Sequence, residues 1–139
     1  MKIYAMTEKG EHSENEDRIL INGNIISDGF FETESTEKTT ICVADGVGGN
    51  NAGAVASSFV CENLKTIVPS SKNDLVDINS QLLMKSTENA NYNGMATTLS
   101  GICISDEKAS SFHIGNTRIY VFQGSYIKQI TEDHTSVNW

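Results

Sequence analysis

The segment 39–51 constrains the fold more than any other, because a buried strand, a glycine turn and a helix start follow one another in it. Residues 39–44 are β-branched or small, which favours a covered strand. Asp45 ends the strand, and three of the next four residues are glycines that permit a tight turn. A carboxylate held beside free carbonyls supplies the hard oxygen ligands that Mg²⁺ or Mn²⁺ prefers. The alternative is an ordinary strand-to-helix turn, since Asp and Gly are common turn residues.

The residues after this turn predict two amphipathic helices. Apolar side chains recur at helical spacing from 51 to 68, which gives one apolar stripe, and Pro69 ends the pattern. Serine and aspartate residues at 70–74 can cap a second helix, whose stripe extends to about residue 91. We expect both helices to pack on a common face of a sheet.

The remaining segments predict strands and turns. Residues 30–38 are polar enough for a surface loop. Because strands precede the two helices and more strands follow them, the pattern favours an α+β fold with an antiparallel sheet over an alternating parallel one. The expected strands are 3–7, 19–21, 25–26, 96–105, 118–123 and 126–131, the last two paired across a Gly-Ser turn.

Size and charge limit the classes of function. The 139 residues fit a single domain. Eighteen Asp and Glu against ten Lys and Arg give a net charge of −8, which opposes binding to nucleic acid or to an anionic membrane. The three cysteines have no pairing or zinc spacing, which indicates reduced thiols. No uncharged apolar run approaches the ~18 residues of a membrane span, so we expect a cytoplasmic protein.

A second polar cluster precedes the expected strand at 19–21. Residues 11–18 contain four carboxylates and a histidine, a composition that polar surface loops often have. If the strand that begins near Asp17 is an antiparallel neighbour of the strand that ends at Asp45, Glu16 and Asp17 meet Asp45. The cluster is then a candidate metal site rather than a solvated loop.

Several common motifs can be set aside. Asn51 stands where a dinucleotide-binding fingerprint needs its third glycine, and no Lys-Ser or Lys-Thr pair follows these glycines as a P-loop requires. His12, His113 and His134 lie too far apart in the sequence for a local zinc signature.

Four short segments carry more information together than any one carries alone. They are 15–18 (Asn-Glu-Asp-Arg), 43–49 (Val-Ala-Asp-Gly-Val-Gly-Gly), 95–99 (Met-Ala-Thr-Thr-Leu), and 114–120 (Ile-Gly-Asn-Thr-Arg-Ile-Tyr) with 131–135 (Thr-Glu-Asp-His-Thr). In this order, with two helices between the second and the third, the chain resembles the metal-dependent protein phosphatases of type 2C. The resemblance covers essentially the whole chain. It implies an antiparallel β-sandwich flanked by helices, and removal of phosphate from phosphoserine or phosphothreonine in proteins.

The resemblance also implies roles for individual residues. In this family two Mg²⁺ or Mn²⁺ ions lower the pKa of a shared water, so that hydroxide attacks phosphorus in line. Asp45 matches the carboxylate that bridges the two ions, and the carbonyl of Gly46 matches a further ligand. Glu16 matches a ligand of one metal, and Asp17 matches a catalytic and metal-site carboxylate that partners metal-bound water.

The chain departs from the family pattern at several positions. The family's arginine that grips the substrate phosphate is replaced by His12, which is a weak donor at neutral pH. Asn116 stands where an aspartate is often linked to a third metal. Val47 stands where some members have a histidine proposed as general acid. The family's domain also continues well beyond Trp139, and its later strands bring two more aspartates to the metals.

Two functions follow from these observations. The first is an intracellular metal-dependent phosphatase acting on phosphoproteins, seen here as the N-terminal part of its domain. The second is a phosphatase-like binding or regulatory module without catalysis. We expect the 139 residues alone to bind divalent metal weakly and to be inactive, because Glu16, Asp17 and Asp45 are few carboxylates for two dications. We also expect self-association, since sheet surface would remain uncovered.

Overall fold

The structure is a computed structural model that describes residues 1–135. The elements along the chain are β1 (Lys2–Thr7), β2 (Asp17–Ile21), β3 (Asn24–Ile26), β4 (Gly29–Glu34), β5 (Thr39–Val47), α1 (Ala52–Leu64), α2 (Lys72–Ser86), the 3₁₀ turn η1 (Ala90–Tyr92), β6 (Ala96–Thr97), β7 (Leu99–Ile104), β8 (Ala109–Ile114), β9 (Tyr120–Gln123) and β10 (Tyr126–Gln129).

A six-stranded antiparallel sheet forms the first layer. Its order is β3-β2-β5-β7-β8, and the short β6 pairs with the end of β5. The prediction of a strand over residues 39–44 is confirmed, because β5 lies between β2 and β7 in the middle of the sheet. Thr39, Cys42 and Ala44 on this strand are buried. The strand predicted for 96–105 is interrupted at Thr98 and becomes β6 and β7.

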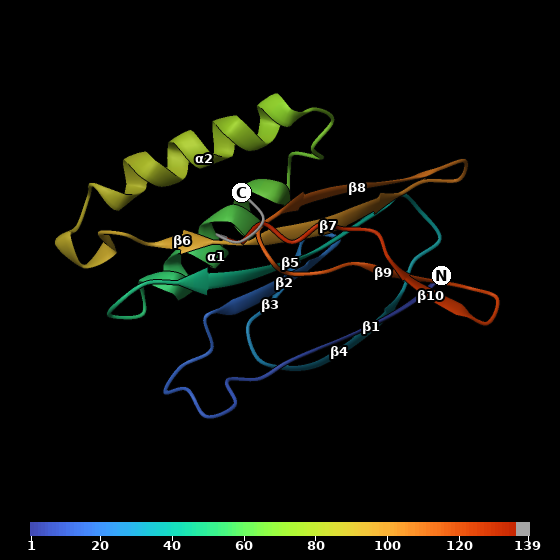
Figure 1. Cartoon of the computed structure of the whole chain (residues 1–139), viewed down its shortest axis with the longest axis horizontal. Coiled ribbons are helices and arrows are strands. Elements are labelled where there is room, and N and C mark those ends of the chain that lie inside the picture. The colour runs from blue at the N-terminus through green and yellow to red at the C-terminus, as the bar shows by residue number, and fades with distance from the viewer. Residues whose placement is uncertain (136–139) are drawn as a thin grey trace.

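The two helices lie on one side of this sheet, with α1 directly on the strands and α2 outside α1 (Figure 1). The predicted extension of the first helix to residue 68 is wrong, because α1 ends at Leu64. β-branched residues at 66–68 disfavour the helix, and Pro69 disfavours helical geometry in the residue before it. The second helix also ends earlier than predicted, at Ser86.

One buried cluster joins the sheet to both helices. It contains Leu20 from β2, side chains along α1, and Ile78 and Leu82 from α2. Both helices lie on the same side of the sheet as expected, but α1 packs on the strands and α2 packs mainly on α1. The stripe of α1 that is buried consists of small residues and Val60 and Leu64, whereas Phe59 is half-buried. Small side chains on α1 let the helix approach the strands closely. The three cysteines, Cys42, Cys61 and Cys103, are free and buried.

The second layer covers the opposite face of the sheet. β1 pairs with β4 in antiparallel register, and Ile3 packs with Ile19, Ile21 and Ile26 of the first layer. The prediction that residues 30–38 form a loop is wrong, because β4 occupies Gly29–Glu34. The outward positions of β4 are polar or exposed, and this hides the strand pattern in the sequence.

β9 and β10 form a separate hairpin in this second layer, as predicted for the Gly-Ser turn. Among the described residues no strand joins this hairpin to the β1–β4 pair. The prediction of an α+β fold with antiparallel sheets and outer helices is confirmed. In residues 1–135 no helix has the length and apolar character needed to cross a bilayer.

Candidate functional site

The pairing of β2 with β5 brings the two acidic segments together. The strands are antiparallel and their register places Asp17 directly opposite Asp45. Side chains of directly opposed residues on one face lie about 4.5–5.5 Å apart at Cβ. The meeting of Asp17 with Asp45 that was expected from the sequence is therefore present, whereas Glu16 precedes the paired residues of β2.

This arrangement makes the ionised form of the Asp17 carboxyl less favourable. Partial burial raises the pKa of the Asp17 carboxyl, and the neighbouring Asp45 raises it further by charge repulsion and a shared hydrogen bond. Arg18 and His12 oppose the rise, since their positive charges lower the Asp17 pKa. A bound cation would relieve the same repulsion, which is a property expected of a metal-binding pair.

The turn before β2 is held by its own polar side chains. The side-chain amide of Asn15 donates to Thr7 Oγ1 at 2.9 Å and to the Ser27 carbonyl at 3.0 Å, and Asn15 Oδ1 accepts from the Asp17 N–H at 3.0 Å. Arg18 Nη1 donates to the carbonyls of Asn15 and Asp17, each at 2.7 Å. This segment presents Glu16 and Asp17 from a fixed backbone rather than from a free loop.

Glu16 is wedged against the start of α1. Its carbonyl accepts a hydrogen bond from Ser57 Oγ at 2.6 Å and from the Gly46 N–H at 3.2 Å. A side chain on Gly53 would stand 2.7 Å from Glu16 Oε2, and a side chain on Gly46 would collide with the Gly53 backbone. Glycine is therefore required at 46 and 53 for the turn, the helix and Glu16 to approach each other.

Thr98 fixes the other side of Asp45. The Asp45 N–H donates to Thr98 Oγ1 at 3.0 Å, and the Thr98 N–H donates to the Asp45 carbonyl at 2.9 Å. Gly46 pairs with Thr97 in the β5–β6 ladder. Through these contacts the Met-Ala-Thr-Thr-Leu segment orients Asp45 at the end of β5.

These residues open into a cleft of about 760 Å³. It contains every predicted site residue: Glu16, Asp17, Asp45, Gly46, His12 and Asn116. Other residues that line it were not predicted as site residues, among them Glu8, Lys9, Asn50, Asn51, Thr97 and Thr98. Lys9 carries the only lysine or arginine side chain among the described residues lining the cleft. A single lysine in a polar loop gives no sequence pattern by which it could be identified.

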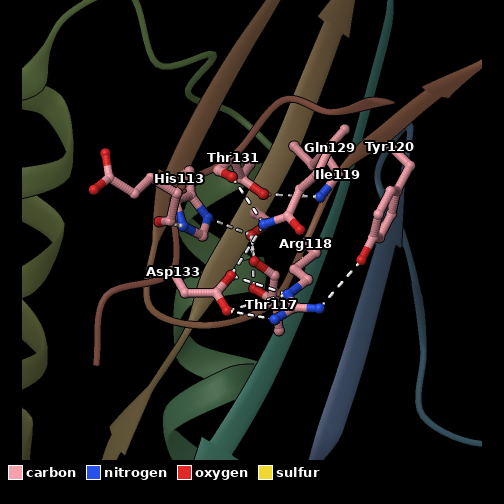
Figure 2. Close-up of polar contacts among 10 residues, drawn as sticks. His113, Thr117, Arg118, Ile119, Tyr120, Gln129, Thr131 and Asp133 are labelled. Carbon is pink, nitrogen blue, oxygen red and sulfur yellow. Dashed lines mark hydrogen bonds and ion pairs between the residues drawn. The ribbon is translucent and has the colours of Figure 1, made fainter. Parts of the chain in front are cut away.

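Asn116 follows the end of β8 and lines the cleft. The next residue, Thr117, belongs to a polar network that includes His113 and joins the two layers (Figure 2). Buried Ser100 of β7 bonds His113 Nδ1 at 2.8 Å and Thr117 Oγ1 at 2.6 Å. Nε2 of His113 bonds the Glu132 carbonyl at 2.8 Å. This network fixes the turn that carries Asn116 into the cleft.

Arg118 and Asp133 continue this network at the surface. The guanidinium donates to both carboxylate oxygens, from Nε to Oδ1 at 3.0 Å and from Nη2 to Oδ2 at 2.6 Å. These bonds lower the pKa of the Asp133 carboxyl and raise that of Arg118. Figure 2 shows Gln129 and Tyr120 bonded to the same pair. The Thr-Glu-Asp-His-Thr segment thus anchors the β9–β10 hairpin.

The donor set suits a hard divalent cation in part. The carboxylates of Glu16, Asp17 and Asp45 and the carbonyl of Gly46 are oxygen donors of the kind that Mg²⁺ and Mn²⁺ take. Within residues 1–135, however, no three His, Cys, Asp or Glu side chains are gathered closely enough to hold a metal ion. The cleft therefore offers an incomplete set of ligands, and its ligands would need to be supplemented by water or by other groups.

Comparison with known proteins gives a consistent result. The protein phosphatase 2C family description matches residues 18–137 of the chain. Protein phosphatase PhpP of Streptococcus pneumoniae is 33% identical over 112 residues, which cover 73% of this chain and 46% of that protein. Serine/threonine phosphatase stp of Listeria welshimeri is 28% identical over 126 residues, with 79% and 48% covered.

A solved structure shows the same architecture. The serine/threonine phosphatase Stp1 from Staphylococcus aureus superimposes with a TM-score of 0.76 at 30% identity, covering 99% of this chain and 55% of that one. The chain spans about half the length of the curated relatives it matches.

Proposed function

The chain belongs to the protein phosphatase 2C family, and from this premise we propose that its cleft serves the metal-dependent hydrolysis of phosphoserine and phosphothreonine in proteins. The three proteins named above are protein phosphatases, and two of them are serine/threonine phosphatases. The observation that carries the proposal is the antiparallel register that sets Asp17 against Asp45 at the cleft.

The residues of the cleft divide into two roles. Asp45, Glu16 and the carbonyl of Gly46 would hold divalent metal. When bound, two Mg²⁺ or Mn²⁺ ions supply charge stabilisation of the phosphoryl oxygens and an acidified water as nucleophile. Asp17, whose pKa is raised, is suited to orient that water and to accept its proton.

Substrate phosphate requires a positive partner on the protein. His12 and Lys9 are the basic side chains that line the cleft among the described residues. Neither side chain has the planar guanidinium group with which arginine donates two parallel hydrogen bonds to a phosphate. Here the phosphate would be attracted by a single positive charge and not by a bidentate pair of hydrogen bonds. We infer weaker orientation of the phosphate here than an arginine would give.

A second function is favoured by a specific observation. His12 and Asn116 replace an arginine and an aspartate, and residues 1–135 gather no three metal-binding side chains. These facts support a phosphatase-like module that acts by protein contact. The two proposals differ in whether Mn²⁺ binding at Asp45 is followed by turnover once enough further metal ligands are present.

The first experiment locates the metal. Mn²⁺ added to isotopically labelled chain should broaden the amide signals of residues 16–17 and 45–46 while leaving those of β9 and β10 sharp. Asp45→Asn should abolish the broadening. Asp106→Asn, which removes one carboxylate from the exposed turn between β7 and β8, should leave it intact. Broadening that survives in Asp45→Asn would overturn the proposed metal site.

The second experiment measures turnover. We expect this chain alone to hydrolyse a phosphopeptide no faster than its Asp45→Ala variant, because two close dications need more carboxylates than it supplies. The measurement is phosphate release in Mn²⁺, beside calorimetric titration of the metal. Mn²⁺-dependent release that disappears in Asp45→Ala would establish this chain as a complete enzyme.

A further inference from the structure

A second groove, distinct from the acidic cleft, lies between α2 and the edge strand β8. Its volume is about 890 Å³, and residues 68–71 between the two helices form part of its lining. Phe112 and Cys103 from the sheet and Leu75 from α2 give it apolar walls. Val76 and Ile114 also line it and are 48% and 42% exposed. The groove therefore offers accessible apolar surface.

The charge of this groove is opposite to that of the chain. Lys38, Lys72 and Lys108 line it, together with His113 and His134. No Asp or Glu is present among the described residues of its lining. Asp74 in the adjoining first turn of α2 already accepts the N–H groups of Ser70 and Ser71 at 2.8 and 3.0 Å. Three of the ten Lys and Arg residues thus gather here in a chain of net charge −8.

Beside this groove, the outer edge of β8 has backbone groups that no described strand pairs with. β8 pairs with β7 on one side, and in the described part of the chain no strand pairs with its other side. An exposed strand edge presents backbone N–H and C=O groups to which an extended peptide can add. β8 has six residues, so a peptide of about six residues, at roughly 3.3 Å per residue, would cover the edge.

The groove adjoins the candidate active site through the chain itself. His113 and Ile114 line the groove, and the next two residues, Gly115 and Asn116, line the acidic cleft. A polypeptide lying along β8 would therefore have its end near Gly115, where the His134 N–H donates to the Gly115 carbonyl at 2.8 Å and residues 132–134 stand between the groove and the cleft.

From these features we propose that the groove between α2 and β8 binds an extended acidic segment of the phosphoprotein substrate, added as a strand along β8. Lys38, Lys72 and Lys108 attract its carboxylates, and Val76 and Ile114 contact its apolar side chains. The identification of the partner as the substrate rests on the proposed function. The binding of an acidic peptide does not depend on catalysis.

The experiment uses an unphosphorylated probe, so that it reports the groove and not the cleft. A fluorescein-labelled ten-residue peptide in which Glu alternates with Val is titrated with the chain, and anisotropy is followed at 50 and 300 mM salt. We expect saturable binding that weakens with salt because the attraction is electrostatic. The amide shifts that accompany binding should lie in residues 110–114. A Lys-Val peptide, and a Glu-Val peptide in which two central valines are replaced by proline, should bind at least tenfold more weakly.

Matched pairs of variants distinguish an effect of the groove lysines on peptide binding from an effect of the net charge of the chain. Lys72→Gln with Lys108→Gln should weaken binding at least tenfold. Lys2→Gln with Lys128→Gln, which removes the same charge from β1 and β10, should change binding less than twofold. Equal loss in both pairs, or equal binding of the Lys-Val peptide, would overturn the inference.

Two further results bear on the occupant. Self-association of the chain that Val76→Glu abolishes would identify a second copy as the occupant and overturn the proposal. Asp45→Asn should leave probe binding unchanged, so loss of metal binding and loss of the groove remain separate outcomes. If the chain bound Mn²⁺ at Asp45 but did not bind the probe, the peptide-binding role of the groove would be refuted and the proposed metal site would stand.

Discussion

The two layers of the molecule differ in how completely they are built. The six-stranded sheet is paired throughout its interior and covered by α1, with Leu20 only 1% exposed. The second layer consists of two separate strand pairs, and Phe122 and Tyr126 on its hairpin are 78% and 80% exposed. The first layer thus has a buried core, whereas the second layer exposes large apolar side chains.

This contrast explains how the site can be formed while remaining incomplete. Asp17, Asp45 and Glu16 all project from the first layer or its edge, where backbone contacts hold them. Glu8, directly after β1, and Glu14, in the loop before β2, also line the cleft, but among the described residues no three such side chains gather closely enough to hold a metal ion. Metal ligands beyond these would have to come from elsewhere, while the shape of the cleft is already set by β2, β5 and α1.

The largest expected effect tests the packing contrast directly. Leu20→Ala in the core should lower the free energy of unfolding by about 2–5 kcal/mol, since a buried methyl-bearing side chain is lost and a cavity remains. Phe122→Ala on the exposed hairpin should change it by less than about 0.5 kcal/mol. Urea unfolding of both variants beside the unmodified chain measures this. Similar losses in the two variants would show that the second layer is packed as tightly as the first.

The next effect concerns the junction between the layers. Ser100→Ala should cost about 1–3 kcal/mol, because His113 and Thr117 would lose a buried partner. Ser110→Ala, at an exposed position of neighbouring β8, is the matched control and should be near neutral. The same urea experiment applies. A neutral Ser100→Ala would mean that the two layers are not coupled through this network.

A third prediction addresses association through the open layer. Exposed apolar surface and free strand edges favour self-association. Phe122→Glu with Tyr126→Glu should weaken it at least tenfold, as measured by sedimentation velocity over a range of concentrations. Leu83→Glu with Met84→Glu, at exposed positions of α2, adds the same charge to the helical layer and should have little effect. A chain that stays monomeric at all concentrations would contradict this prediction.

The first layer could be predicted from the sequence more fully than the second. The β5 turn and α1 follow from apolar runs, glycines and helical spacing, which are local signals. β4 was predicted as a loop, because its inward face carries only Phe31 and Thr33 while Glu32 and Glu34 face outward. The length of α1 was overestimated, since the apolar pattern continues through residues whose branched side chains do not favour a helix.

Within the site, residue identities were easier to predict than their supports. Asp17 and Asp45 could be paired in advance because antiparallel neighbours bring the start of one strand to the end of the other. The contacts of Ser57 and Gly53 with Glu16 could not, since they depend on the tertiary approach of α1 to the turn. Lys9 was missed because a single lysine in a polar loop carries no pattern.

The smallest expected effect separates the layers by their response to acid. Bonds from Arg118 hold the pKa of Asp133 below its usual value, whereas bonds from the backbone N–H groups of Ser70 and Ser71 do the same for Asp74 in the helical layer. In both cases the folded state favours the ionised carboxylate. The stabilisation is therefore complete above the unfolded pKa, near ~3.9, and is lost as the pH falls through the lower folded pKa.

Asp133→Asn should therefore reduce protection of the Ile119 and Ile130 amides against hydrogen exchange near neutral pH by a few-fold, roughly the size expected of a surface ion pair. The difference from the unmodified chain should shrink as the pH falls through the lowered pKa of the folded Asp133, and vanish once Asp133 is protonated in both states. Asp74→Asn should instead affect amides of α2 and leave Ile130 unchanged. If either variant lowered protection equally in both layers, the layers would unfold as one cooperative unit, and the openness of the second layer would be a matter of surface composition rather than of stability.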